Sequence, residues 1–142
     1  MPFENPSRTE IEALLRRARR IAVVGLSENP ARPSHRVASA LQGFGYTVLP
    51  VNPALESVLG TKSVPDLDAA VATLEPGEHI DIVDVFRHPR HVAPIVDDVI
   101  RLRLPALWLQ DGVIDEESAL RARAAGVFVV MNRCLFRDRA TF

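Results

Sequence analysis

The 142-residue sequence lacks the features that mark secreted and membrane-spanning proteins. Its single cysteine, Cys134, excludes an internal disulfide bond. No stretch reaches the roughly 18 consecutive apolar residues that a membrane span needs. Residues 1–6 also lack a basic region followed by an apolar one, so they do not form a secretory signal. We therefore expect a cytosolic protein that does not contact a membrane.

An excess of positive charge is also missing. Seventeen basic residues nearly balance eighteen acidic ones, and the formal net charge is -1. Nucleic-acid binding requires a concentrated basic face. The arginines between positions 16 and 20 form one local cluster, but their helical spacing beside two leucines is typical of a solvated helix face. We therefore expect no nucleic-acid partner.

The sequence alternates short apolar runs with amphipathic segments. The length predicts one domain over residues 1–142, with its core at about 8–137. A capping box, Ser7 to Glu10, marks the start of the first helix. We expect strands over residues 21–24, 46–51, 61–64, 80–86, 106–109 and 127–131. We expect helices over residues 8–19, about 34–43, 55–59, 67–74, 89–102 and 115–125.

This alternation predicts an α/β fold with a Rossmann-like, doubly wound, mainly parallel sheet. The six strands would take the order 3-2-1-4-5-6, and ligands of such sheets bind beyond the carboxyl ends of the strands where the order reverses. Three loops meet at that point, and they begin at Gly25, Asn52 and Arg87. These loops are therefore the expected binding site.

The first loop, residues 25–34, is poor in glycine and has no lysine. A dinucleotide fingerprint needs three glycines where this loop has one, and a P-loop needs a lysine followed by Ser or Thr. Ser34 is expected to cap the following helix, whose N-terminus attracts anions, and Arg32 supplies a positive charge nearby. The loop therefore suits a phosphate without matching either of the common nucleotide motifs.

The second strand has no acidic residue at its end, which reads Val51-Asn52-Pro53. NAD-binding domains usually place an acid there to accept the ribose 2′-hydroxyl, so its absence argues against NAD. A neutral end tolerates a phosphorylated ribose, which an acid would repel. NADP and coenzyme A both carry such a phosphate, and these residues do not choose between them.

Several segments taken together resemble a known family. They are residues 21–27, Arg32-Pro33-Ser34, residues 51–53, residues 81–87, residues 108–110 and residues 132–134. In this order they resemble the small stand-alone CoA-binding proteins, which are similar to the CoA-binding domain of succinyl-CoA synthetase alpha subunits. The resemblance covers residues 8–137, nearly the whole chain.

The resemblance implies coenzyme A as the ligand, with the first loop at the diphosphate and the second and fourth loops at the adenosine. The implied site consists of Gly25, Leu26, Ser27, Arg32, Pro33, Ser34, Asn52, Pro53, Phe86 and Arg87.

Other residues allow two interpretations each. Gly25 serves either a tight turn or ligand contact, and Phe86 either closes the core or faces adenine. Cys134 follows a strand and an arginine, which suits either a thiol of lowered pKa or a structural cysteine. Asp81 and Asp84 lie inside an apolar run, where they either cap the neighbouring loop backbone or face a ligand.

No catalytic or metal constellation follows from the spacing of residues. The pair His88-x-x-His91 has no acid or cysteine beside it at a ligand position, so we expect no metal. The phosphorylated histidine of the synthetase subunits lies on a second domain, which this chain is too short to include. The leading hypothesis is therefore a non-catalytic carrier, sensor or regulatory module for coenzyme A or an acyl-CoA. The alternatives are an NADP-linked oxidoreductase, a CoA-dependent transferase, or an adaptor with a structural nucleotide.

Overall fold

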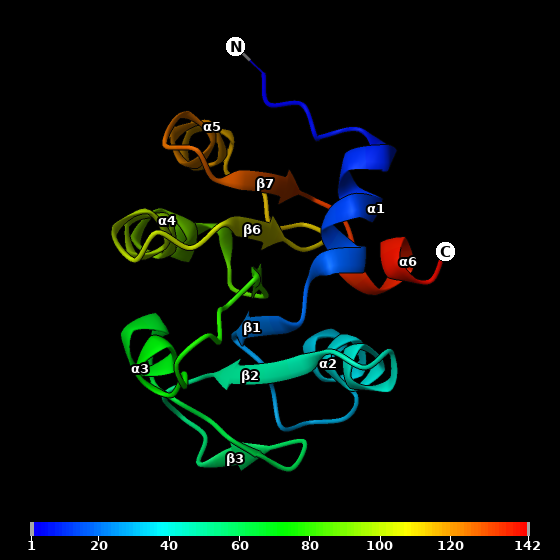
Figure 1. Cartoon of the computed structure of the whole chain (residues 1–142), viewed down its shortest axis with the longest axis vertical. Coiled ribbons are helices and arrows are strands. Elements are labelled where there is room, and N and C mark those ends of the chain that lie inside the picture. The colour runs from blue at the N-terminus through cyan, green and yellow to red at the C-terminus, as the bar shows by residue number, and fades with distance from the viewer. Residues whose placement is uncertain (1, 142) are drawn as a thin grey trace.

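A central parallel sheet organises the computed structural model, which describes residues 2–141 (Figure 1). The sheet has five strands in the order β2-β1-β5-β6-β7, and every neighbouring pair is parallel. Its strands are β1 (Arg20–Val24), β2 (Thr47–Val51), β5 (Ile82–Val85), β6 (Ala106–Leu109) and β7 (Phe128–Met131). The expected Rossmann-like, doubly wound architecture is confirmed.

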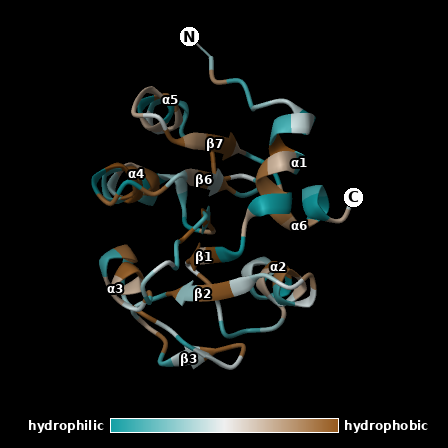
Figure 2. Cartoon of the chain, viewed as in Figure 1, coloured by the Kyte–Doolittle hydropathy of each residue, from teal (hydrophilic) through white to brown (hydrophobic). Residues whose placement is uncertain are grey.

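Helices cover both faces of the sheet. Figure 1 shows α3, α4 and α5 on one face and α1, α2 and α6 on the other. Their bounds are α1 (Arg8–Arg17), α2 (Pro33–Gly43), α3 (Leu67–Ala72), α4 (Val92–Arg101), α5 (Glu116–Ala124) and α6 (Leu135–Arg139), with a 3-10 turn at Pro89–His91 before α4. In Figure 2, β1 and β7 are mainly hydrophobic while the helices are mixed, as expected when both sheet faces are buried. No helix within residues 2–141 has the length and apolar character to span a bilayer.

The capping box predicted for the first helix is present. The Ser7 side chain accepts a hydrogen bond from the Glu10 N–H at 3.2 Å, and the Ser7 N–H donates to Glu10 Oε1 at 3.1 Å. Asp81 also fulfils one of its two interpretations, because its carboxylate accepts the N–H groups of Arg19 at 2.7 Å and Arg20 at 3.0 Å. Asp81 therefore fixes the loop that leads into β1.

The short helix expected over residues 55–59 is wrong, and the third strand expected over residues 61–64 is present only in part. Residues 55–59 form no helix; instead β3 (Ser57–Val58) pairs antiparallel with β4 (Thr61–Lys62). Leu59 and Gly60 both have positive φ, 52° and 76°, which is typical of a tight hairpin turn. Only Val64 keeps a parallel bridge, to Val51 of β2. The hairpin takes the place of a third strand, and the order of the other five strands is as predicted.

Helix α6 was not predicted. It is only five residues long, too short for a helical hydrophobic period to be recognised. Leu135, its first residue, is fully buried on the same side of the sheet as Trp108. This short helix forms one wall of the site described next.

Candidate functional site

An open cleft of about 940 Å³ lies at the carboxyl edge of the sheet. It is lined by the loop after β1, helix α2, the ends of β5 and β6, and the segment around α6. Six of the ten residues implied by the family resemblance line it: Gly25, Ser27, Arg32, Pro33, Ser34 and Phe86. Nine lining residues were not assigned from the sequence: Arg36, Val37, Ala40, Gln110, Asp111, Val113, Cys134, Phe136 and Arg137.

The other four expected residues lie outside the lining of this cleft. The side chain of Leu26 is fully buried in the core. Asn52 uses its amide to hold two loops, because Nδ2 donates to the Leu26 carbonyl at 3.0 Å and Oδ1 accepts the Ala54 N–H at 2.9 Å. Pro53 is exposed beyond β2, and Arg87 packs beside Gly25. Asn52 and Leu26 therefore support the first loop, residues 25–34, and Arg87 lies next to that loop.

Ser34 does not cap α2, contrary to the expectation. The cap residue is Arg32, which makes no side-chain capping hydrogen bond, and Pro33 occupies the first helical position. Ser34 comes next and is buried, and its Oγ accepts the Ser27 N–H at 3.0 Å. The hydroxyl thus fixes the shape of the first loop. Pro33 begins the helix in its place, because its ring supplies the helical φ and it has no N–H group that needs a partner.

Gly25 is required by the backbone at its position. Its φ is +86°, a conformation that other residues rarely adopt. A Cβ atom there would lie 3.1 Å from the carbonyl oxygen of Phe86 and 2.8 Å from Cδ of Arg87. The tight-turn interpretation therefore has direct structural support, and the same turn brings the backbone to the cleft.

Most N–H groups of the first loop are already occupied. The N–H of Asn29 donates to Ser27 Oγ, that of Ala31 to Asn29 Oδ1, and that of Arg32 to the Asn29 carbonyl. Among the described residues, no acceptor faces the N–H groups of Leu26, Glu28 or Ser34. A phosphate at this loop would therefore meet few backbone donors, so side-chain charge has to contribute more.

Positive charge without a carboxylate partner lies beside the first loop. Within residues 2–141, the guanidinium groups of Arg32 and Arg87 make no hydrogen bond or ion pair. Desolvation, with the nearby charges of Arg87 and Arg90, lowers the pKa of His91. Neither the Arg32 nor the Arg87 guanidinium is paired with a carboxylate of the described residues, so both charges remain available to an anion at this loop.

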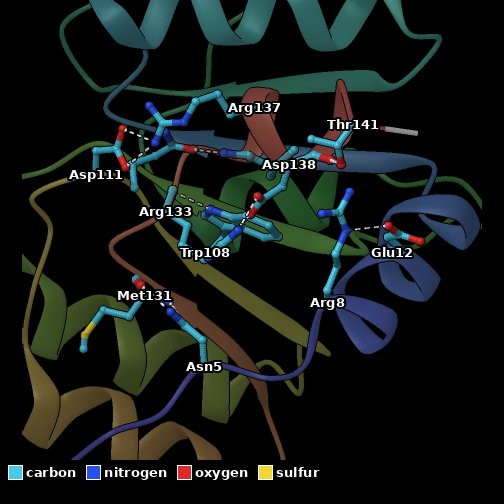
Figure 3. A network of polar contacts seen from close by, with 12 residues as sticks. Asn5, Arg8, Glu12, Trp108, Asp111, Met131, Arg133, Arg137, Asp138 and Thr141 are labelled. Carbon is cyan, nitrogen blue, oxygen red and sulfur yellow. Dashed lines mark hydrogen bonds and ion pairs between the residues drawn. The ribbon is translucent and has the colours of Figure 1, made fainter.

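The opposite wall of the cleft is held together by polar contacts (Figure 3). Arg137 of α6 donates to both carboxylate oxygens of Asp111 at 2.8 Å. The Trp108 indole N–H donates to the carbonyl of Arg133 at 2.8 Å, and the Arg133 side chain pairs with Asp138. These contacts tie α6 to the end of β6.

Gln110 and Cys134 lie on this wall and are almost completely buried, with exposed fractions of 3% and 9%. Gln110 follows directly after an apolar strand, and the same position after a strand led to the prediction of Asn52 and Arg87 as site residues. The sequence therefore contained a signal, the position after a strand, that could have identified Gln110. The burial of Cys134 favours the structural interpretation of its thiol.

Asp84 is the most unusual residue near the cleft. It lies on β5 two residues before Phe86, so both side chains point to the same face of the sheet. Asp84 is fully buried, and neither of its carboxylate oxygens has a hydrogen-bond partner among the described residues. Burial raises the pKa of Asp84 well above its ordinary value. The side chain therefore neither caps a loop nor lines the cleft, and its burial favours the protonated form.

No group of three or more His, Cys, Asp and Glu side chains suited to a metal ion occurs in the part of the chain that the structure describes. Of the two histidines considered as ligands, His88 uses Nδ1 to accept the Arg90 N–H at 3.1 Å.

Comparison with known proteins places relatives across almost the whole chain. Residues 19–139 match the family described as CoA binding domain. The uncharacterized protein YneT of Bacillus subtilis is 39% identical over 133 residues, which cover 94% of each chain.

Solved structures share the fold. A protein from Thermus thermophilus has a TM-score of 0.86 at 36% identity, over 96% of this chain and 98% of that one. A hypothetical protein from Pyrococcus horikoshii has a TM-score of 0.86 at 32% identity, over 99% and 95% of the two chains. An acetyl-coenzyme A synthetase of Ca. Korarchaeum cryptofilum matches with a TM-score of 0.64 at 21% identity, over 80% of this chain and 26% of that one. At that identity the likeness shows the fold alone.

Proposed function

Because the chain belongs to the CoA binding domain family, we propose that it binds coenzyme A or an acyl-CoA at the cleft and acts as a non-catalytic carrier, sensor or regulatory module. The observation that carries this proposal is the pair of unpartnered arginines, Arg32 and Arg87, on the loop between the Gly25 turn and α2 and beside that turn, respectively. Phosphate groups favour such a position, because the helix N-terminus and the guanidinium charges act in the same direction.

The shape of the cleft suits a long ligand arm. The cleft runs from the end of β1 past β5 to the end of β6, which is two strand spacings or about 10 Å. With the diphosphate at residues 25–34, the adenosine would lie toward Asn52 and Pro53 after β2, and Arg87, which packs beside Gly25, would stay near the diphosphate. The pantetheine arm would then follow the cleft toward Gln110.

The residues that line the cleft support ligand binding without a catalysed reaction. It contains one thiol, that of Cys134, and no histidine. A nucleophile needs a base within hydrogen-bond reach, and none of the lining residues offers an imidazole for that role. The proposal therefore assigns no reaction to the chain.

Titration calorimetry against coenzyme A, acetyl-CoA, NAD, NADPH and ATP tests the ligand. We expect the two CoA compounds to bind most tightly. A thermal-shift assay gives a second readout, since a ligand at about 100 times its Kd adds roughly 2.7 kcal/mol of stability. Preference for NADPH would replace the proposal with the oxidoreductase alternative.

Replacing Arg32 with alanine should weaken coenzyme A binding by about ten-fold. A hydrogen bond to a charged group is worth roughly 1.5–3 kcal/mol, and the low end applies because Arg32 is exposed. Calorimetry on Arg32→Ala measures the effect. Arg17→Ala is the matched control, because Arg17 is an exposed arginine at the end of α1, outside the cleft. Equal coenzyme A affinities for the wild type and Arg32→Ala would contradict the placement of the ligand's phosphate at this loop.

Purified protein should show no thioester hydrolysis, acyl transfer or hydride transfer. The reason is that the lining of the cleft offers no imidazole to act as a base. Assays with acetyl-CoA and with NADPH, run at protein concentrations above the Kd, check this. Turnover that disappears in a variant of a cleft residue would overturn the non-catalytic role.

A further inference from the structure

Gln110 follows β6, which lies two strands away from β1 and the first loop. Its backbone is fixed, because its N–H donates to the Val85 carbonyl at 3.3 Å and its carbonyl accepts the Val113 N–H at 2.9 Å. Its side chain lines the cleft although only 3% of the residue is exposed. The side chain is therefore held in one place rather than free in solvent.

The orientation of the Gln110 amide follows from its one hydrogen bond. Its Oε1 accepts the backbone N–H of Leu135 at 3.1 Å, in a buried contact between β6 and α6. A backbone N–H can only donate, so the amide oxygen has to face it and the NH₂ group has to point away.

The NH₂ group of Gln110 has no partner. None of the hydrogen bonds within residues 2–141 uses its Nε2 atom. In this part of the chain, the only fully buried side-chain polar atoms without a partner are the two oxygens of Asp84. Nε2 therefore keeps contact with solvent, and it reaches that solvent through the cleft that Gln110 lines.

The surroundings of this donor favour a neutral acceptor. Val113 and Cys134 are apolar neighbours on the same wall, with exposed fractions of 7% and 9%. Arg137, which lines the cleft on this wall, is already paired with the carboxylate of Asp111, and Arg133 is paired with Asp138. A phosphate would be drawn instead to the unpaired arginines at the first loop. An amide N–H in an apolar wall pairs best with a carbonyl oxygen.

We propose that Gln110 recognises a carbonyl group of the ligand, namely an amide or thioester carbonyl carried by a pantetheine arm. The inference rests on the proposed function and adds a specificity residue to it. Gln110 selects ligands that carry the arm over the nucleotide part alone, because the nucleotide part does not extend to the end of β6.

The test compares Gln110→Glu with the wild type by calorimetry against three ligands: coenzyme A, acetyl-CoA and adenosine 3′,5′-bisphosphate. Glutamate keeps an acceptor for the Leu135 N–H and removes the donor. The bisphosphate carries no pantetheine arm, so it reports any general charge effect of the new carboxylate. We expect coenzyme A affinity to fall by about ten-fold or more, while bisphosphate affinity changes by less than about two-fold. If circular dichroism shows that the glutamate variant is unfolded, Gln110→Met gives a second comparison, although it removes both the donor and the acceptor for the Leu135 N–H.

The outcomes separate the inference from the proposed function. A larger loss for acetyl-CoA than for coenzyme A identifies the thioester carbonyl, and equal losses identify an amide of the arm; both support carbonyl recognition. Unchanged coenzyme A affinity, or an equal loss for all three ligands, overturns the role of Gln110 while the proposed function stands. Wild-type protein that binds none of the three overturns both.

Discussion

Replacing Asp84 with asparagine should make the protein more stable at neutral pH and should remove a pH dependence that the wild type shows. Asparagine has nearly the same shape but cannot ionise. In the folded protein burial raises the pKa of Asp84 well above its ordinary value, whereas the unfolded chain ionises it near 3.8. Each pH unit between these two pKa values therefore costs the wild type up to about 1.4 kcal/mol of unfolding free energy.

The sign follows from the proton count. Between the two pKa values the folded state holds one more proton than the unfolded state, so raising the pH favours unfolding. The contribution of Asp84 to stability is therefore complete below about pH 4 and is lost as the pH rises through the folded-state pKa. Urea unfolding of both proteins at several values between about pH 4 and pH 8 measures the difference.

Asp68→Asn is a matched control. The hydrogen bond from Arg101 lowers the pKa of the exposed Asp68, so its contribution has the opposite sign and is lost as the pH falls. We expect this variant to be less stable than the wild type at neutral pH. Parallel pH profiles for the wild type and Asp84→Asn would mean that the Asp84 carboxylate is solvated, contrary to its burial.

Replacing Gly25 with alanine should destabilise the protein by about 2 kcal/mol or more. A left-handed backbone costs a non-glycine residue roughly 1–2 kcal/mol. The new Cβ would also lie 3.1 Å from the Phe86 carbonyl oxygen, which is backbone and cannot move freely. Arg87 can swing aside, but doing so takes its charge away from the loop. Gly25→Val should be worse on both counts, and we expect folded Gly25→Ala to bind coenzyme A more weakly than Arg32→Ala.

Gly43→Ala is the control, because Gly43 has neither a left-handed backbone nor a close neighbour at the position of a Cβ atom. Gly43 is the last residue of α2, its φ is not positive, and nothing lies within 4 Å of a Cβ placed there. Alanine is favoured over glycine in helices by roughly 0.5–1 kcal/mol, so this variant should be at least as stable as the wild type. Urea unfolding compares the three proteins, and calorimetry follows on those that fold. Full stability of Gly25→Ala would contradict the strain argument for the turn.

The strands of the sheet were predictable because their signals are local. Apolar runs such as residues 21–24 and 106–109 are buried on both faces, and the alternation with helices leaves few possible strand orders. Position at the end of a strand was enough to place Gly25 and Phe86 at the carboxyl edge. The errors arose where the pattern is short: a two-residue turn at Leu59 and Gly60 replaced the expected helix, and α6 is too short for a period.

By itself, then, the sequence predicted the parallel sheet and pointed to its carboxyl edge, where the structure has a cleft. An anion site at the first loop stays a prediction. Only the tertiary structure decided which residues share the cleft, since the contacts that matter join segments far apart in the chain. Leu135 orients the amide of Gln110, and Arg137 reaches Asp111 from α6. The sequence left Asp84 with two polar roles, and the structure gives it neither. Hydrophobic periodicity is carried by neighbours along the chain, whereas the pairing or isolation of a polar group depends on what the fold brings against it.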